Sequence, residues 1–315
     1  MKITAFAGGV GGAKLANGLS KLLAAEDLCV IVNTGDDFEY LGLYICPDLD
    51  TVTYNLAGLN DPASGWGLKG DTHNVLDAIE KFGHTKWFRL GDQDFATHIE
   101  RTKLLRSGYT LSQVTQKISS NLGVKHTILP MSDEPVQTKI ITDKHEILPF
   151  QEYFVRYQTK PVVREILFNG IEKCSLPDIA ATKLESSDII IICPSNPYVS
   201  IDPILAVPGV SSILLTKTVI AVSPLIGGKT IKGPAAKIMG EFGMVPNSLN
   251  IAKHYQSIIS GIVIDNRDLL EQEAISHCGI IPLVTDIYMH DVESQVNLAR
   301  QVLDFGSSLL KGKQQ

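Results

Sequence analysis

The sequence predicts an α/β protein with a doubly wound, mostly parallel, Rossmann-like sheet and an inserted smaller α+β subdomain. Apolar runs with the length of strands alternate with helical patterns along most of the 315 residues, which is typical of a parallel sheet. The first run, residues 3–7, ends in a glycine cluster that precedes a helical pattern, as in many doubly wound folds. Between residues 127 and 168, three strand-like runs follow one another without a helix.

The elements of the first 122 residues follow from apolar spacing and turn residues. A helical pattern begins at Ala13 and carries Leu15 and Leu19 on one face. Further along, strands are expected at 29–32 and 86–90, and helices at 71–82, 95–106 and 111–122.

The remaining elements divide between the insertion and the rest of the sheet. Strand-like runs lie at 127–129, 138–142 and 163–168, and later strands are expected at 188–193, 219–222 and 261–264. The run at 189–192 is all isoleucine and fits a parallel strand covered on both faces. Helices are expected near 203–217, 235–242, 250–258 and 292–310, before a polar tail at 311–315. We therefore expect a Rossmann-like core of residues 1–94 and 186–315, and an inserted subdomain of residues 95–185.

Composition limits the classes of function. The net charge is −6 and no basic tract is present, which argues against nucleic acid as a partner. No apolar run approaches the length of a membrane span, and the apolar start is too short for a signal peptide. The five cysteines are scattered without a C-x-x-C motif. We therefore expect a cytoplasmic protein that binds neither membrane nor nucleic acid.

The glycine cluster is the first candidate site and consists of Gly8, Gly9, Gly11 and Gly12. Glycines let backbone N–H groups approach a ligand, and the N-terminus of the following helix suits a phosphate. Lys14 adds a full positive charge. The cluster matches neither the dinucleotide fingerprint nor the P-loop, so a turn that only lets strand and helix pack closely is the alternative. If it binds phosphate, Gly11→Val should weaken nucleotide binding and leave the fold mostly intact.

Four more polar clusters are expected beside predicted strand ends, at residues 33–37, 89–94, 194–196 and 223–229. Because the carboxyl ends of parallel strands lie along one edge of a sheet, these clusters should share a cleft with the glycine loop. Ser195, Asn196 and the backbone of Gly227 and Gly228 supply hydrogen-bond donors there. A plain turn at Ser195 and an ordinary surface loop at Gly227 are the alternatives.

Carboxylates in these segments are candidates for holding Mg²⁺, which prefers oxygen ligands and often lies beside substrate phosphates. The six are Asp36, Asp37, Asp48, Asp50, Asp92 and Asp94. About half of them should instead cap helices or face solvent. Arg89 has a structural alternative too, an ion pair with Asp92 or Asp94.

Long motifs in order along the chain resemble the 2-phospho-L-lactate transferase family of coenzyme F-420 biosynthesis. They are AGGVGGAK (7–14), NTGDDFEYLGLYICPDLDTVTY (33–54), GWGLKGDT (65–72), RLGDQDFATHIERT (89–102), CPSNPYVSI (193–201) and SPLIGGKTIKGPA (223–235). The resemblance covers nearly the whole chain, and the number and length of the motifs make it specific.

The resemblance implies a Mg²⁺-dependent transferase. A 2-phospholactyl or phosphoenolpyruvyl group would pass from a guanosine diphosphate-linked donor to the primary hydroxyl of 7,8-didemethyl-8-hydroxy-5-deazariboflavin, with release of GMP. It implies that Asp50 and Arg89 contact the deazaflavin acceptor. The glycine loop, Ser195 and Asn196 would lie against the guanosine nucleotide, and the family is usually homodimeric.

Asp50 is our candidate catalytic residue, either accepting the proton of the acceptor hydroxyl or holding the metal. Asp36 is the second candidate metal ligand. The sequence does not decide between a lactyl and an enolpyruvyl donor, because one saturated bond is a small difference for a pocket.

Two other functions compete. A related bacterial family of non-catalytic, nucleotide-sugar-binding regulators resembles these transferases, but Asp50, Arg89 and the GDQD segment favour the enzyme. An NAD(P) oxidoreductase follows from the fold class alone, and the incomplete fingerprint at Lys14 argues against it.

Overall fold

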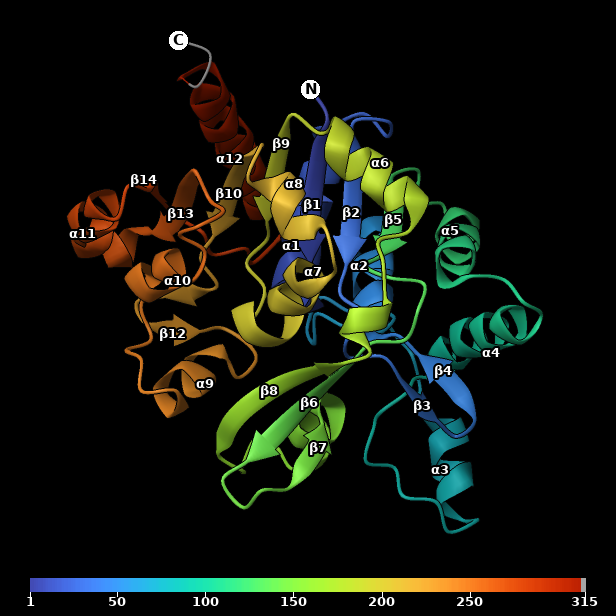
Figure 1. Ribbon diagram of the computed structural model, residues 1–315. Helices are drawn as coiled ribbons and strands as arrows, with labels where there is room; N and C mark the ends of the chain where they lie inside the picture. Colours follow the sequence, from blue (N-terminus) through green and yellow to red (C-terminus); the bar gives the residue numbers. More distant parts are fainter. Residues whose placement is uncertain (313–315) are drawn as a thin grey trace.

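The computed structural model describes residues 1–312 and is built around a seven-stranded parallel sheet (Figure 1). The strand order is β14-β13-β10-β9-β1-β2-β5, and every pair in it is parallel. The strands are β1 (Ile3–Ala7), β2 (Leu28–Val32), β5 (Thr127–Pro130), β9 (Ile189–Ile192), β10 (Thr218–Val222), β13 (Gly261–Asp265) and β14 (Ile281–Thr285). This confirms the predicted fold class, and the all-isoleucine run is the middle strand.

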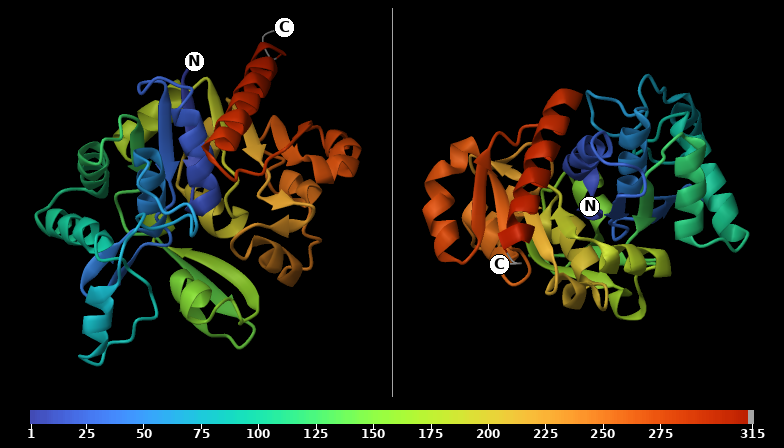
Figure 2. Two further views of the ribbon diagram at one scale, coloured as in Figure 1. Left: turned by 180° about the vertical axis from the view of Figure 1, so that it is seen from behind. Right: turned by 90° about the horizontal axis from the view of Figure 1, so that it is seen from above.

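Helices cover both faces of this sheet because side chains alternate between the faces along each strand. On β9, Ile189 and Ile191 join one hydrophobic core, and Ile190 and Ile192 join the other. The first core contains side chains of α1 (Gly9–Ser20), α2 (Pro47–Ala57), α5 (Leu111–Asn121) and α12 (Val292–Gly312). The second contains side chains of α6 (Asp178–Ser186), α7 (Asp202–Ala206), α8 (Val210–Leu214), α9 (Ala235–Glu241), α10 (Ser248–His254) and α11 (Gln272–His277). Figure 2 shows α1 and α12 side by side.

Three small antiparallel sheets surround the carboxyl edge of the central sheet. Their strands are β3 (Phe38–Tyr40) with β4 (Leu43–Ile45), β6 (Gln137–Thr142) with β7 (Ile147–Pro149) and β8 (Val163–Asn169), and β11 (Leu225–Ile226) with β12 (Lys229–Thr230). The predicted strands at 138–142 and 163–168 are therefore present in an antiparallel sheet. The predicted strand at 127–129 is β5, but it pairs in parallel with β2 in the central sheet, so its expected place among the strands of the insertion is wrong. The subdomain edges at 95 and 185 stay a prediction.

The remaining short elements flank the carboxyl edge and the ends of the sheet. They are α3 (Asn74–Glu80), α4 (Asp94–Arg106), the π-helical turns η1 (Glu152–Arg156) and η3 (Pro197–Ile201), and the 3₁₀ turns η2 (Ile171–Lys173) and η4 (Asn266–Glu271). Within residues 1–312, no helix is both long and apolar enough to cross a membrane.

The predicted strand at residues 86–90 is wrong. Its apolar residues Trp87 and Phe88 pack in an aromatic cluster with Phe38 and Tyr40 of the β3–β4 hairpin. Within residues 1–312, this segment is paired with no strand.

Other differences are smaller. The helix expected at 203–217 is divided into α7 and α8 around Gly209, which has a φ of 90°. The edge strand β14 was not expected. Of the predicted polar tail, residues 313–315 lie outside the described residues.

The contact of α1 with α12 generates a stability prediction. A Cβ atom at Gly18 of α1 would lie 2.2 Å from the backbone oxygen of Gln295, so Gly18→Ala must push the two helices apart. We expect the free energy of unfolding in urea to fall by about 1–3 kcal/mol. Gly240→Ala is the matched control, because a Cβ atom at this exposed position of α9 meets nothing within 4 Å. Equal effects of the two substitutions would contradict this account.

Candidate active site

A cavity of about 410 Å³ opens at the carboxyl edge of the central sheet. The chain runs outward from β1 through β2 to β5 on one side, and from β9 to β14 on the other. The order of the strands thus reverses between β1 and β9, which is where ligands bind in doubly wound sheets. Gly8 follows β1 and Pro194 follows β9, and both line the cavity.

Most of the predicted site residues line this cavity. They are Gly8, Gly9, Gly11, Lys14, Ser195 and Asn196 of the nucleotide set, together with Asp36, Asp50 and Arg89. Gly12, Gly227 and Gly228 of the nucleotide set do not line it. The ligand that each of these residues contacts stays a prediction.

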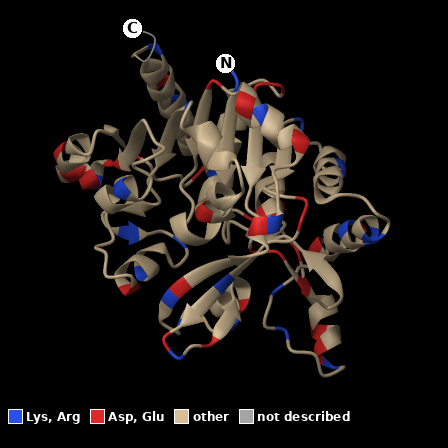
Figure 3. Cartoon of the chain, viewed as in Figure 1, with Lys and Arg blue, Asp and Glu red and all other residues tan. Residues whose placement is uncertain are grey.

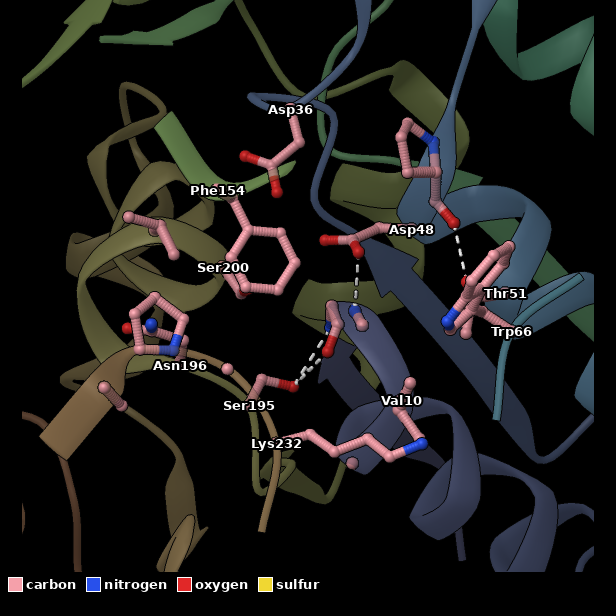
Figure 4. A pocket seen from close by; sticks show the side chains of 18 of the residues that line it. Val10, Asp36, Asp48, Thr51, Trp66, Phe154, Ser195, Asn196, Ser200 and Lys232 are labelled. Atoms are coloured by element: carbon pink, nitrogen blue, oxygen red, sulfur yellow. Dashed lines mark hydrogen bonds between the residues drawn. The ribbon is translucent and has the colours of Figure 1, made fainter. Parts of the chain in front are cut away.

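The start of the glycine loop is held by two side chains from other segments (Figure 4). The Gly8 N–H donates to Ser195 Oγ over 3.1 Å, and the Ser195 hydroxyl donates to the Gly8 carbonyl over 2.7 Å. The Gly9 N–H, the first of helix α1, donates to Asp48 Oδ1 over 2.7 Å. The next two N–H groups, of Val10 and Gly11, belong to the first turn and have no acceptor within the helix. They are the backbone donors that remain for an anion.

Gly11 and Gly12 are needed for close packing against the chain after β9. A Cβ atom at Gly11 would lie 2.2 Å from the Pro194 carbonyl oxygen, and one at Gly12 would lie 2.5 Å from Ser195 Oγ. Valine at position 11 would therefore disturb the fold, so the expectation that Gly11→Val leaves the fold mostly intact is wrong. Gly12 makes room for the serine instead of facing the cavity.

Two further groups add hydrogen-bond donors and positive charge to this side of the cavity. The Asn196 side chain accepts a bond from the Tyr198 N–H at 3.1 Å through Oδ1. Its Nδ2 atom is buried and has no partner within residues 1–312. Lys14 donates to the Met289 carbonyl at 2.7 Å. Burial, followed by the charge of Lys232, lowers the pKa of Lys14.

Gly227 and Gly228 form the two-residue turn between β11 and β12. Their φ angles are 57° and 71°, and a hairpin turn with both central φ angles positive requires residues such as glycine. The turn explains this glycine pair without a ligand, as the ordinary-loop alternative proposed.

Carboxylates form the opposite side of the cavity. Asp36 and Asp48 line it and are about 95% buried. Burial, then the charges of Asp48 and Asp37, raise the pKa of Asp36 well above its usual range, although Asn33 opposes the shift. Burial raises the pKa of Asp48 to about 6, against hydrogen bonds from Asn33 and Gly9. Oδ1 of Asp36 and both carboxylate oxygens of Asp37 are buried without a hydrogen-bond partner within residues 1–312.

Asp50 is held by a residue that the sequence analysis did not single out. The Arg101 guanidinium of α4 binds both of its carboxylate oxygens, with Nη1 at 3.0 Å from Oδ2. His98 lies between Asp50 and Asp94, with its ring nitrogens 3.6 and 3.4 Å from their oxygens. Asp50, Asp94 and His98 each offer one ligand atom within 4.8 Å of the others. The spacing 94, 98, 101 places these side chains on one face of a helix, which is the signal that would have found them.

The Asp94 carboxylate is tied into the same cluster. It accepts a bond from the Tyr54 hydroxyl at 2.6 Å. Burial raises its pKa, but the contacts with His98 and Tyr54 more than offset this, so that its pKa lies below the usual value.

Segments 70–74 and 89–94 bind each other through reciprocal helix capping. The Asp92 carboxylate accepts bonds from the Asn74 and Val75 N–H groups at the start of α3, at 3.0 and 2.9 Å. The Asp71 carboxylate accepts bonds from the Gln93 and Asp94 N–H groups at the start of α4, at 2.8 and 3.1 Å. Hydrogen bonds from Thr72, Val75 and Asn74 lower the pKa of Asp92 to about 2. Asp92 is therefore a capping residue, as expected for about half of the six carboxylates.

The Arg89 side chain is oriented by a hydrogen bond to a histidine, and not by an ion pair. Its Nε–H donates to His73 Nε2 over 2.8 Å, and His73 Nδ1 lies 2.9 Å from the Leu90 carbonyl. Because a carbonyl oxygen only accepts, Nδ1 donates, and Nε2 is left to accept from Arg89. Within residues 1–312, Arg89 makes no ion pair with Asp92 or Asp94.

Aromatic side chains from two other segments complete the cavity. Phe150 and Phe154, at β7–η1 in the inserted region, stack with centroids 5.6 Å apart and rings inclined by 6°. Figure 4 shows Phe154 directed into the cavity beside Asp36 and Ser200. Trp66 enters from the loop before α3. Neither phenylalanine was among the residues that the sequence pointed to.

Comparison with known proteins identifies the family. Residues 3–298 match the family described as 2-phospho-L-lactate transferase CofD. The chain belongs to this family. It is 38% identical over 298 residues to the 2-phospho-L-lactate transferase of Methanosarcina mazei, covering 95% of this chain and 98% of that protein. It is 35% identical over 316 residues to the phosphoenolpyruvate transferase of Streptomyces griseus, covering 98% and 99%. The resemblance seen in the motifs, and the expectation of an enzyme of this type, are confirmed.

Solved structures support the fold independently. A member of the UPF0052 family from Bacillus halodurans superimposes with a TM-score of 0.61 over 96% of this chain and 98% of that one. At 14% identity this likeness shows the fold alone. The family match favours the enzyme over the regulator and the oxidoreductase.

The reciprocal capping predicts the effect of removing one carboxylate. Asp71→Ala leaves the first N–H groups of α4 without an acceptor, so we expect the free energy of unfolding to fall by about 1 kcal/mol. Urea denaturation followed by circular dichroism measures this. Asp304→Ala, at an exposed position of α12, is the control and should change stability little. An unchanged stability of Asp71→Ala would show that this capping does not hold the segment.

Proposed function

We propose that this protein transfers a 2-phospholactyl or phosphoenolpyruvyl group from a guanosine diphosphate-linked donor to the primary hydroxyl of 7,8-didemethyl-8-hydroxy-5-deazariboflavin. GMP is released, and the step belongs to coenzyme F-420 biosynthesis. The observation that carries the proposal is the family match over residues 3–298. Relatives named for either transferred group align at 35–38% identity, so both donors remain in the proposal. We further propose that the protein is cytoplasmic and forms a homodimer.

The two sides of the cavity suit the two substrates. Donors and positive charge for a diphosphate come from the Val10 and Gly11 N–H groups, from Lys14 and from Asn196 Nδ2, which has no partner in the described part of the chain. Acidic and basic residues are interspersed over the molecule in Figure 3, and the net charge is −6. Attraction of a phosphate therefore depends on these local groups.

On the proposed acceptor side, Asp50 and Arg89 line the cavity. Arg101 fixes the direction of the Asp50 carboxylate, which can then accept a hydrogen bond from the acceptor hydroxyl and orient its oxygen. His73 directs Arg89 in the same way.

The transfer forms one P–O bond and breaks another. The acceptor oxygen bonds to the phosphorus that carries the lactyl or enolpyruvyl ester, and the bond from this phosphorus to the GMP oxygen breaks. GMP leaves with the electron pair, and the hydroxyl proton passes to a carboxylate or to water. Positioning and neutralisation of charge supply most of the rate in such a reaction, so no covalent nucleophile is needed.

Mg²⁺ fits the carboxylate side on the chemistry of the donors present. Asp36 and Asp37 carry buried oxygens that have no hydrogen-bond partner among residues 1–312, and the charge of Asp48 acts on Asp36. Buried like charges without a cation are unfavourable, and oxygen ligands are those that Mg²⁺ prefers. Asp36 would hold the metal. The cluster of Asp50, Asp94 and His98 is an alternative site, in which Asp50 would be a metal ligand, as proposed from the sequence. Bound Mg²⁺ would neutralise negative charge on the diphosphate.

This site predicts a pH dependence of metal binding. Protonated carboxyl groups do not bind Mg²⁺, and the pKa values of Asp36 and Asp48 are raised, that of Asp48 to about 6. Mg²⁺ affinity should fall as the pH decreases through 6, and binding near neutral pH should release protons. Calorimetry in buffers of different ionisation enthalpy measures both. Asp36→Asn should weaken binding about tenfold or more, while Asp304→Asn should not. Equal affinity at pH 5 and pH 8 would contradict the assignment.

The function itself is tested with the purified protein, the deazaflavin, each guanosine-linked donor and Mg²⁺. We expect the phosphodiester and GMP to form in equal amounts, as measured by chromatography and mass spectrometry. Absence of both products with both donors would overturn the proposal.

Arg89→Met tests the acceptor side in the same assay. We expect the KM for the deazaflavin to rise about tenfold or more, because a charged donor is lost, and the KM for the donor to change little. Arg300→Met, on α12 and outside the cavity, is the control. If only the KM for the guanosine-linked donor rises, Arg89 binds the donor and not the deazaflavin, which would contradict the assignment.

A further inference from the structure

Lys232 lies in the segment between β12 and α9 and lines the cavity. Its ammonium group donates to the carbonyl of Ser64, in the loop that carries Trp66. A Cβ atom at Gly65 of that loop would lie 2.6 Å from Val10 Cγ1 and 3.4 Å from Lys232 Nζ. The Trp66 loop, Lys232 and the first turn of α1 therefore meet at one place, and Figure 4 shows Lys232 beside Val10.

Lys14 also lines this cavity, and burial, followed by the charge of Lys232, lowers its pKa. Each of the two ammonium groups donates to a single backbone carbonyl, that of Lys14 to Met289 and that of Lys232 to Ser64. Within residues 1–312, neither has a carboxylate within ion-pair distance. Both line the cavity beside the Val10 and Gly11 N–H groups at the start of α1. Two like charges near a helix N-terminus repel each other, and an anion with more than one charge would relieve this repulsion.

The ammonium group of Lys232 can bind such an anion without releasing the loop. It has three N–H donors, and the Ser64 carbonyl takes one. An anion bound beside Val10 would accept a second bond and so would be linked through Lys232 to the Trp66 loop. Occupation of the site would then hold this loop in place.

We propose that Lys14 and Lys232 clamp the diphosphate of the nucleotide from two sides, and that Lys232 couples its binding to the ordering of the Trp66 loop. The inference deepens the proposed function, because it rests on a nucleotide diphosphate as the ligand. Lys232 is a binding residue, and the Trp66 loop is the element that it positions.

Calorimetry of the full chain with GDP, GMP and inorganic pyrophosphate tests the clamp. We expect Lys232→Met to weaken GDP and pyrophosphate about tenfold or more, because a charge-assisted bond is lost, and GMP less. Lys232→Arg should retain part of the affinity. Lys69→Met removes the same charge from an exposed position near the same loop, outside the cavity, and should bind GDP like the unmodified protein. Equal GDP affinity in Lys232→Met, or equal losses in both methionine variants, would overturn the clamp.

The fluorescence of Trp66 can be used to follow the loop that carries it. Trp66 and Trp87 are the two tryptophans of the chain, so Trp87→Phe leaves Trp66 as the single emitter. GDP should shift its emission, and Lys232→Met should abolish the shift at saturating GDP. An unchanged shift in that variant would overturn the coupling.

These readouts separate the clamp from the proposed reaction. Lys232-dependent binding of GDP without any turnover would keep the clamp and reject the reaction. If the protein catalyses the transfer and Lys232→Met leaves the KM for the donor unchanged, the reaction is supported and the clamp is rejected.

Discussion

The site depends on how closely the chain after β1 approaches the chain after β9. Gly11 lies so near the Pro194 carbonyl that a Cβ atom would come within 2.2 Å of its oxygen. This approach lets Ser195 bond both backbone groups of Gly8. A side chain at these glycines would push the two strand ends apart, and the groups that follow them would no longer face one cavity.

From this contact the cavity divides into two sides of opposite character. The amides of the first turn of α1 and two lysines lie on one side, and buried carboxylates lie on the other. Asp48 joins the two sides, because it bonds the Gly9 N–H while facing Asp36. A transfer between a diphosphate donor and a hydroxyl acceptor needs this combination, with positive charge for the leaving group and carboxylates for a metal and a proton.

The sequence predicted the fold and much of the cavity, because strand ends and glycine clusters are local signals. Predictions from the sequence failed where a side chain contacts a residue that is distant in the sequence. Trp87 and Phe88 resembled a strand, yet they pack on the β3–β4 hairpin. The buried pairing of Asp50 with Arg101 joins two helices, and it could be found only by extending the helical face of residues 94, 98 and 101 to a second element.

A crystal structure of the protein with GDP, Mg²⁺ and the deazaflavin tests the central claim most directly. The account predicts the diphosphate against the Val10 and Gly11 amides, the metal on the carboxylate side, and the deazaflavin hydroxyl between Asp50 and the nucleotide. A diphosphate bound away from the start of α1, with the deazaflavin outside this cavity, would contradict it.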